Sequence, residues 1–223
     1  MIGPAGKNRS MEFLVDHAAR YRALGNGVPE NLHVPVAAVD EDAIRKYIGE
    51  IQQELGRGSP ARALLVRAKE PPPIDLRFPI WDLEASKIFH ERMQVWVHVD
   101  YTRYRHAYRN AFPTEDISDK ILSHTLNRRI AVIKGFQYTR ITATSRSANS
   151  SAAFSEGWGV ELYRKPDELA AFKKKGLSIQ YADLTDLMLM MDMKLGGGVM
   201  DAVNAAQKLI DPRLDGVVVA CSR

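Results

Sequence analysis

Residues 93–100, with the sequence MQVWVHVD, alternate between two kinds of side chain, and this pattern constrains the fold more than any other feature. One set consists of Val95, Val97 and Val99, and the other of Gln94, Trp96, His98 and Asp100. Successive side chains of a β-strand point to opposite faces of the sheet. The segment is therefore predicted to be a strand whose valine face is covered by a second layer.

Apolar residues at helical spacing predict helices in the same chain. The clearest case begins at Asp40 and ends at Gly56, with Ile44, Ile48 and Leu55 on one face. Similar patterns predict further helices at 11–24, 81–91, 118–134, 166–175, 183–195 and 199–210, strands at 63–68, 136–143, 160–163, 177–181 and 216–221, and a loop at 144–155. Residues 101–112 either continue the strand 93–100 or form a helix. Helices and strands are mixed without a regular βαβ order, which indicates an α+β protein.

The three prolines at 71–73 mark the best candidate for a domain boundary. Consecutive prolines form a stiff extended connector. We therefore expect an N-terminal helical arm over residues 1–73. A mixed α/β domain with a small sheet and several packed helices is expected over 74–223.

Composition excludes several classes of protein. The chain has 223 residues, 45% of them hydrophobic and 26% charged, values typical of globular domains. Its single cysteine, Cys221, excludes an internal disulfide framework and a multi-cysteine metal site. No stretch reaches the roughly 18 apolar residues of a membrane span, and the first ten residues lack the apolar core of a secretory signal. A cytoplasmic protein without a membrane partner is expected.

Positive charge is concentrated in the middle of the chain. Residues 101–150 contain seven arginines and two lysines against three acids, a net charge of +6, whereas the whole chain carries +4. A basic stretch in a nearly neutral protein is typical of a surface that meets phosphate, and arginine suits bidentate phosphate contacts. In the alternative interpretation, these arginines lie on several faces and pair with acids from elsewhere.

The first functional hypothesis is nucleic-acid binding through the basic segment 101–146. Tyrosines alternate with arginines in residues 101–112, which favours RNA or a single strand. The predicted helix 118–134 places His124, Asn127 and Arg128 on one polar face, which suits contacts to phosphates or base edges. A half-buried tyrosine stripe and a solvated helix face are the structural alternatives. The predicted nucleic-acid contacts are Arg103, Tyr104, Arg105, Arg109, Lys120, Asn127, Arg128, Arg140 and Arg146.

The second hypothesis is a metal-dependent nuclease. His98, Asp100 and His124 could hold a divalent metal in a strand-plus-helix site that resembles the His-Asn-His nucleases, with His98 as general base. The chain departs from that group because it shows no clear β-hairpin between strand and helix and no cysteine pairs. A histidine that is merely hydrogen-bonded on a sheet face is the structural alternative. Outside this hypothesis no cofactor is expected.

The third hypothesis is a structural or assembly protein. The helices predicted over 184–210 are apolar on most sides and rich in methionine, which suits either a buried core or contact with identical copies. The nucleic-acid-binding protein of the first hypothesis could act alone or within a larger ribonucleoprotein or viral particle, whereas this third one would form a homo-oligomer. The polar loop predicted at 144–159, with Arg146 within it, is a candidate anion site.

Overall fold

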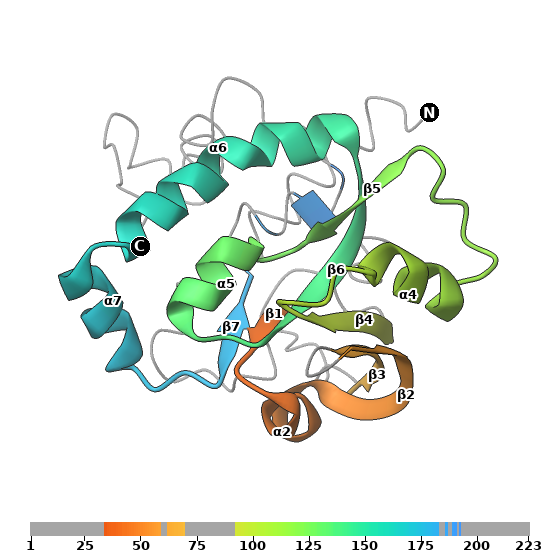
Figure 1. The fold of residues 1–223 in the computed structure, drawn as a ribbon, viewed down its shortest axis with the longest axis horizontal. Helices are drawn as coiled ribbons and strands as arrows, with labels where there is room; N and C mark the ends of the chain where they lie inside the picture. The colour runs from red at the N-terminus through yellow and green to blue at the C-terminus, as the bar shows by residue number, and fades with distance from the viewer. Residues whose placement is uncertain are drawn as a thin grey trace, which may run out of the picture.

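The computed structural model describes residues 34–58, 62–69 and 92–182, together with residues 186, 189, 190 and 192. Within them, a curled antiparallel sheet of seven strands forms a half-barrel (Figure 1). The strands follow the order β2-β3-β4-β6-β1-β7, and β5 pairs with β6 beside this path. Their bounds are β1 Pro35–Ala38, β2 Gly49–Arg57, β3 Arg62–Ala68, β4 Met93–His98, β5 Lys120–His124, β6 Tyr138–Ser145 and β7 Ile179–Tyr181.

Strand β6 organises the sheet because its two halves have different neighbours. Tyr138 and Thr139 pair with β4 on one side and with β1 on the other. From Ile141 to Ser145 the strand pairs instead with β5. The first half of β6 therefore lies in the middle of the sheet, and its second half lies beside β5.

Short helices surround the sheet. Their bounds are α2 Glu41–Ala43, the π-helical turn η3 Ile44–Ile48, α4 Tyr104–Ala111, α5 Arg128–Lys134, α6 Arg146–Tyr163 and α7 Pro166–Lys173. Figure 1 shows α4 apart from the group formed by α5, α6 and α7, with α2 next to β2 and β3.

Strand β4 is buried on both faces. Val95 and Val97 pack in one apolar cluster with Tyr108 of α4. Trp96 points to the opposite face, where it packs with Leu64 and with Ile44 of η3. The strand predicted at 93–100 is thus confirmed over Met93–His98, and the alternation separates two layers of core.

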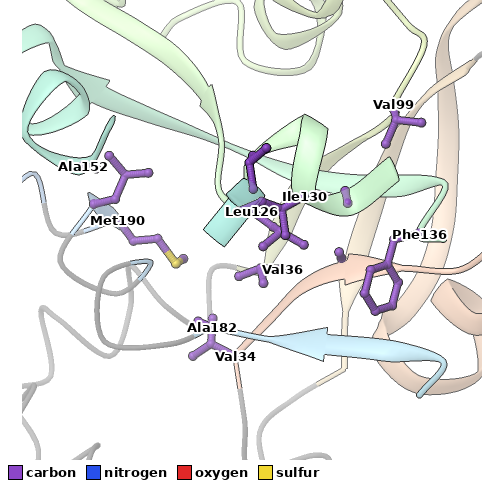
Figure 2. Packing of buried hydrophobic residues seen from close by; sticks show 13 residues of the cluster. Val34, Val36, Val99, Leu126, Ile130, Phe136, Ala152, Ala182 and Met190 are labelled. Carbon is purple, nitrogen blue, oxygen red and sulfur yellow. The ribbon is translucent and has the colours of Figure 1, made fainter. Parts of the chain in front are cut away.

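A third cluster fills the space between β1 and the helices α5 and α6. Val34 and Val36 pack there against Leu126 and Ile130, and Met190 joins them (Figure 2). Met190 is buried against this chain's own core, which is one of the two uses suggested for the methionine-rich segment. Residues 193–210 and the predicted strand at 216–221 lie outside the described residues.

The predicted N-terminal helical arm is wrong where it can be examined. Asp40 does begin a helix, accepting a hydrogen bond from the Ala43 amide at 2.7 Å, but α2 and η3 end at Ile48. Gly49–Arg57 then forms β2, which pairs with β3, which in turn pairs with β4. The sheet is accordingly large, and strands from either side of the prolines belong to it. The prolines and the predicted helices 11–24 and 81–91 lie outside the described residues.

The pairing of β2 with β3 contains two bulges, which disturb the alternation expected of a strand. The pairing register with β3 shifts between Ile51 and Gln53 and again between Glu54 and Gly56. At each bulge two residues oppose one on the partner strand, so strict alternation is lost. Ile51 and Leu55 are four residues apart in sequence, a spacing that also fits a helix, but they pack in different apolar clusters.

Two further segments differ from prediction. The single helix expected at 118–134 is instead strand β5, a turn and helix α5, which begins after Asn127. The loop expected at 144–155 and the strand expected at 160–163 are both parts of α6. This helix begins where the Ser145 hydroxyl accepts a hydrogen bond from the Ala148 amide at 3.2 Å. Predicted elements close to β3, α7 and β7 are confirmed, and residues 104–111, for which strand and helix were both open, form helix α4.

Candidate nucleic-acid interface

Helix α4 separates its apolar and polar residues cleanly. Ala107 and Tyr108 are buried, whereas Arg105 and Arg109, one turn apart, are exposed. Arg103, which immediately precedes the helix, is exposed as well. Arg103, Arg105 and Arg109 are called the α4 face below. Arg105 and Arg109 lie on one side of α4 and Arg103 precedes it, and all three guanidinium groups belong to exposed residues.

The tyrosines of the same segment point inward. Tyr108 is 5% exposed, its hydroxyl donates to the Glu115 carboxylate at 3.1 Å, and its ring packs on Phe112 at 5.0 Å. Tyr101 is likewise buried. Tyr104 is half-buried, with its ring centroid 5.1 Å from that of His124. The structure thus matches the half-buried stripe that was the alternative to a stacking platform.

The beginning of β5 lies next to the α4 face. Arg105 Nη2 donates to the Lys120 carbonyl at 3.0 Å. Lys120 pairs across the sheet with Ser145, and the next residue, Arg146, is exposed and begins α6. Arg105, Lys120 and Arg146, which are 15 to 41 residues apart in sequence, are therefore brought to one end of the β5–β6 pair.

Asp192 neutralises one of these cations. Its Oδ2 lies 2.8 Å from Lys120 Nζ, and its Oδ1 accepts hydrogen bonds from the Ser145 amide and the Thr144 hydroxyl, both at the end of β6. Burial alone raises the pKa of Asp192, but the hydrogen bonds from these partners more than offset it and lower that pKa to about 2. The carboxylate is therefore charged at neutral pH and holds Lys120 in place.

Charge compensation differs between the two halves of the described chain. Arg45, Arg62 and Arg67 each lie within 3.9 Å of a glutamate oxygen, and Arg164 does so as well. Seven exposed arginines have no carboxylate of the described residues within ion-pair distance. They are Arg92, Arg103, Arg105, Arg109, Arg128, Arg129 and Arg146.

Asn127 and Arg128 do not share a helix face with His124, contrary to the prediction. The Asn127 side-chain oxygen accepts a hydrogen bond from the Arg129 amide at 2.8 Å and so caps α5. Arg128 is exposed at the first position of that helix. Both residues follow the end of β5 that is opposite to Lys120.

His124 is held in a mostly buried position at the end of β5. Its Nδ1 is 2.7 Å from the Thr139 hydroxyl, and Tyr104 packs against its ring. Burial, with a smaller contribution from the positive charge of Arg128, lowers the pKa of His124 to about 4. The imidazole is therefore neutral at physiological pH.

His98 and Asp100 are close to each other but not to a third ligand. The Asp100 amide donates to His98 Nδ1 at 3.2 Å, and the His98 ring meets the Tyr138 ring edge-on. Within the described part of the chain, which includes His98, Asp100 and His124, no three His, Cys, Asp or Glu side chains form a group that could hold a metal ion. The three predicted ligands are not brought together.

Arg140 lies in the interior. It is 2% exposed and pairs in register with Trp96, while its carbonyl accepts hydrogen bonds from the Thr125 amide and hydroxyl. Its guanidinium is therefore not part of the surface described above. Arg146, the next arginine along the chain, is exposed.

Sequence reasoning missed a second group of cations. Arg45, Arg67, Lys69 and Arg92 line one hollow beside β2 and β3. They are spread over 48 residues and interspersed with acids, so no linear run of charge marks them. The four residues come together through the pairing of β2 with β3 and of β3 with β4, which the sequence pattern did not predict.

Comparison with known proteins finds no matching family model and no significant match among curated proteins or solved structures. Among the helices of the described residues, none is long and apolar enough to cross a membrane.

Proposed function

We propose that this protein binds nucleic acid through its phosphate backbone, using the α4 face and the neighbouring Arg146. The observation that carries the proposal is the set of exposed arginines without a carboxylate partner in the described residues. Exposed guanidinium groups without a carboxylate partner can bind an anion from solution. A polyanion whose charges repeat along a strand can contact several of them.

The contacts proposed are to phosphate and not to bases. Preference for RNA or single strands depended on tyrosines stacking against bases, and Tyr101 and Tyr108 are buried instead. Arginines on an exposed helix face can still bind phosphate oxygens with two parallel hydrogen bonds. Binding is therefore expected to depend strongly on salt and weakly on sequence.

The test compares two triple variants that lose the same charge. Arg103→Ala/Arg105→Ala/Arg109→Ala removes the α4 face. Arg164→Ala/Lys165→Ala/Lys174→Ala removes three exposed cations at the ends of α6 and α7. Affinity for a labelled single-stranded RNA, a single-stranded DNA and a DNA duplex is measured by fluorescence anisotropy at several salt concentrations.

Each phosphate contact contributes about 0.7–0.9 to the slope of log K against log salt. Losing three contacts lowers that slope by about 2 to 3 for the α4-face variant. The control variant keeps the slope of the unmodified protein. Equal slopes for the two variants would remove α4 from the interface, and thermal unfolding of both confirms that they are folded.

Neither alternative function is proposed from this geometry. The nuclease hypothesis requires His98, Asp100 and His124 to share a metal, and they form no such group in the described residues. The assembly hypothesis depends on 184–210, of which the structure describes only four residues. Recovering the oligonucleotide intact or cleaved after the binding assay, with and without Mg²⁺, would bear on the first of these.

A further inference from the structure

Four cationic side chains from separate segments converge on one hollow at the edge of the sheet. Arg45 comes from η3, Arg67 from β3, Lys69 from the residue after β3, and Arg92 from the residue before β4. The hollow has a volume of about 460 Å³, and Gly49, Glu50 and Ala68 complete its lining. This size lies within the range of small-molecule sites, about 300–1,000 Å³.

Backbone pairing fixes the place of these residues. The Ala68 amide donates to the Arg92 carbonyl at 2.7 Å, and the Lys69 amide donates to the Ile48 carbonyl at 2.8 Å. Gly49 opposes Ala68 in the β2–β3 register. A Cβ atom at Gly49 would overlap the Arg67 carbonyl oxygen, so the close approach of the two strands requires glycine here.

The lining carries an excess of positive charge. Glu50 is its one acid, and Arg67 Nη2 donates to Glu50 Oε2 at 2.6 Å, which lowers the pKa of Glu50. Lys69 Nζ donates to the Lys46 carbonyl, a neutral partner that positions the ammonium without cancelling its charge. Arg45 is 3.9 Å from Glu41 and more than half exposed. Lys69 and Arg92 are therefore the two cations of the lining that have no carboxylate of the described residues within ion-pair distance.

We infer that this hollow is a binding site for a phosphorylated ligand with at least two negative charges, of the size of a diphosphate or a nucleotide. Guanidinium groups bind phosphate oxygens with two parallel hydrogen bonds, and an ammonium adds a point charge. Four cationic side chains line the hollow, so an anion fits it better than a neutral ligand does. The site lies beside β2 and β3 and shares no residue with the α4 face, so it does not depend on the proposed function.

The test uses inorganic pyrophosphate as the probe and isothermal titration calorimetry at low salt. Arg45→Ala/Arg92→Ala removes two exposed cations for which the described residues show no side-chain hydrogen bond, so folding should be retained. Arg164→Ala/Lys165→Ala removes the same charge elsewhere. We expect pyrophosphate to bind the unmodified protein and the control alike, with at least a tenfold weaker affinity for the pocket variant.

Further arms separate the sources of the phosphate group. Arg67→Lys keeps the charge but loses the fork of guanidinium donors, and it should weaken pyrophosphate binding as well. If the pocket variant binds a single-stranded oligonucleotide as tightly as the control does, the ligand is a small phosphorylated molecule. If the pocket variant binds both pyrophosphate and the oligonucleotide more weakly than the control does, the site binds a phosphate of a nucleic-acid backbone. Absence of pyrophosphate binding, equal affinity of pocket and control variants, or equal binding of sulfate at the same ionic strength would overturn the inference.

Discussion

The protein should lose stability between pH 7 and pH 5 because His124 must remain neutral in the folded state. Its pKa is lowered to about 4 by burial and by the charge of Arg128, against 6.5 in the unfolded chain. The unfolded state therefore binds a proton first as the pH falls. The stability contributed by the neutral imidazole is complete above pH 6.5 and is lost as the pH falls towards 4.

Linkage gives the size of the effect. For pKa values of 6.5 unfolded and about 4 folded, the free energy of unfolding falls by about 2 kcal/mol between pH 7 and pH 5. Urea unfolding of the unmodified protein and of His124→Gln at pH 7, 6 and 5 measures it. Glutamine keeps a polar group for the Thr139 hydroxyl but does not titrate, so its pH dependence should be flatter by this amount.

His106→Gln is the matched control. His106 is exposed on α4, where its Nε2 lies 3.2 Å from Asn110 Nδ2, so its replacement should leave the pH dependence of stability unchanged. The reasoning is refuted if His124→Gln and His106→Gln show the same change of unfolding free energy with pH, whatever their stabilities at pH 7.

Two further predictions concern packing and charge and are measured by urea unfolding. Asp192→Asn should lower the free energy of unfolding at pH 7 by about 1 kcal/mol, a value reduced for the partial exposure of the pair with Lys120, whereas Asp119→Asn should not. Because the pKa of Asp192 is about 2 in the folded state and 3.8 otherwise, this difference should fade as the pH falls from 4 towards 2; a difference that persists at pH 2 would contradict the ion-pair interpretation. Gly157→Ala should stabilise α6 by about 1 kcal/mol, because a Cβ there meets nothing within 4 Å. Gly49→Ala should destabilise the protein, because a Cβ there would overlap the Arg67 carbonyl oxygen. Equal changes of unfolding free energy for Gly49→Ala and Gly157→Ala would show that β2 and β3 do not approach each other closely at Gly49.

The strand at 93–98 could be predicted because nothing interrupts its alternation. Both of its faces are buried, yet valines on one face and Gln94 and Trp96 on the other keep the two sets distinct. Strand β2 could not be predicted, since its apolar residues have a helical spacing and its two bulges remove the strict alternation of a strand. In these two segments, the local sequence pattern predicts a strand correctly only where the pairing between strands is regular.

Residues 118–134 show a second way in which spacing misleads. Leu122, Leu126 and Ile130 are four residues apart, as on one helix face, but they lie in a strand, a turn and a helix. Leu122 packs in a different cluster from the other two. His124 therefore lies in the protein interior next to Thr139 and not on a basic helix face.

The candidate site was predictable in part. Clustering of arginine in 101–146 was visible in the sequence, and exposure of the α4 face is consistent with it. Burial of Arg140 and of the tyrosines depends on which sheet face each residue occupies, which no linear charge count contains. The phosphate pocket was not predictable, because Arg45, Lys69 and Arg92 are brought together only by strand pairing.

The most direct test of the central claim is the salt dependence of nucleic-acid binding by the unmodified protein. Fluorescence anisotropy with a labelled RNA strand and a DNA duplex should show binding at low salt that weakens steeply as salt is raised. Contacts from the α4 face and Arg146 predict a slope of log K against log salt of about −3 or steeper. Absence of binding at low salt, or binding that does not change with salt, would contradict the account.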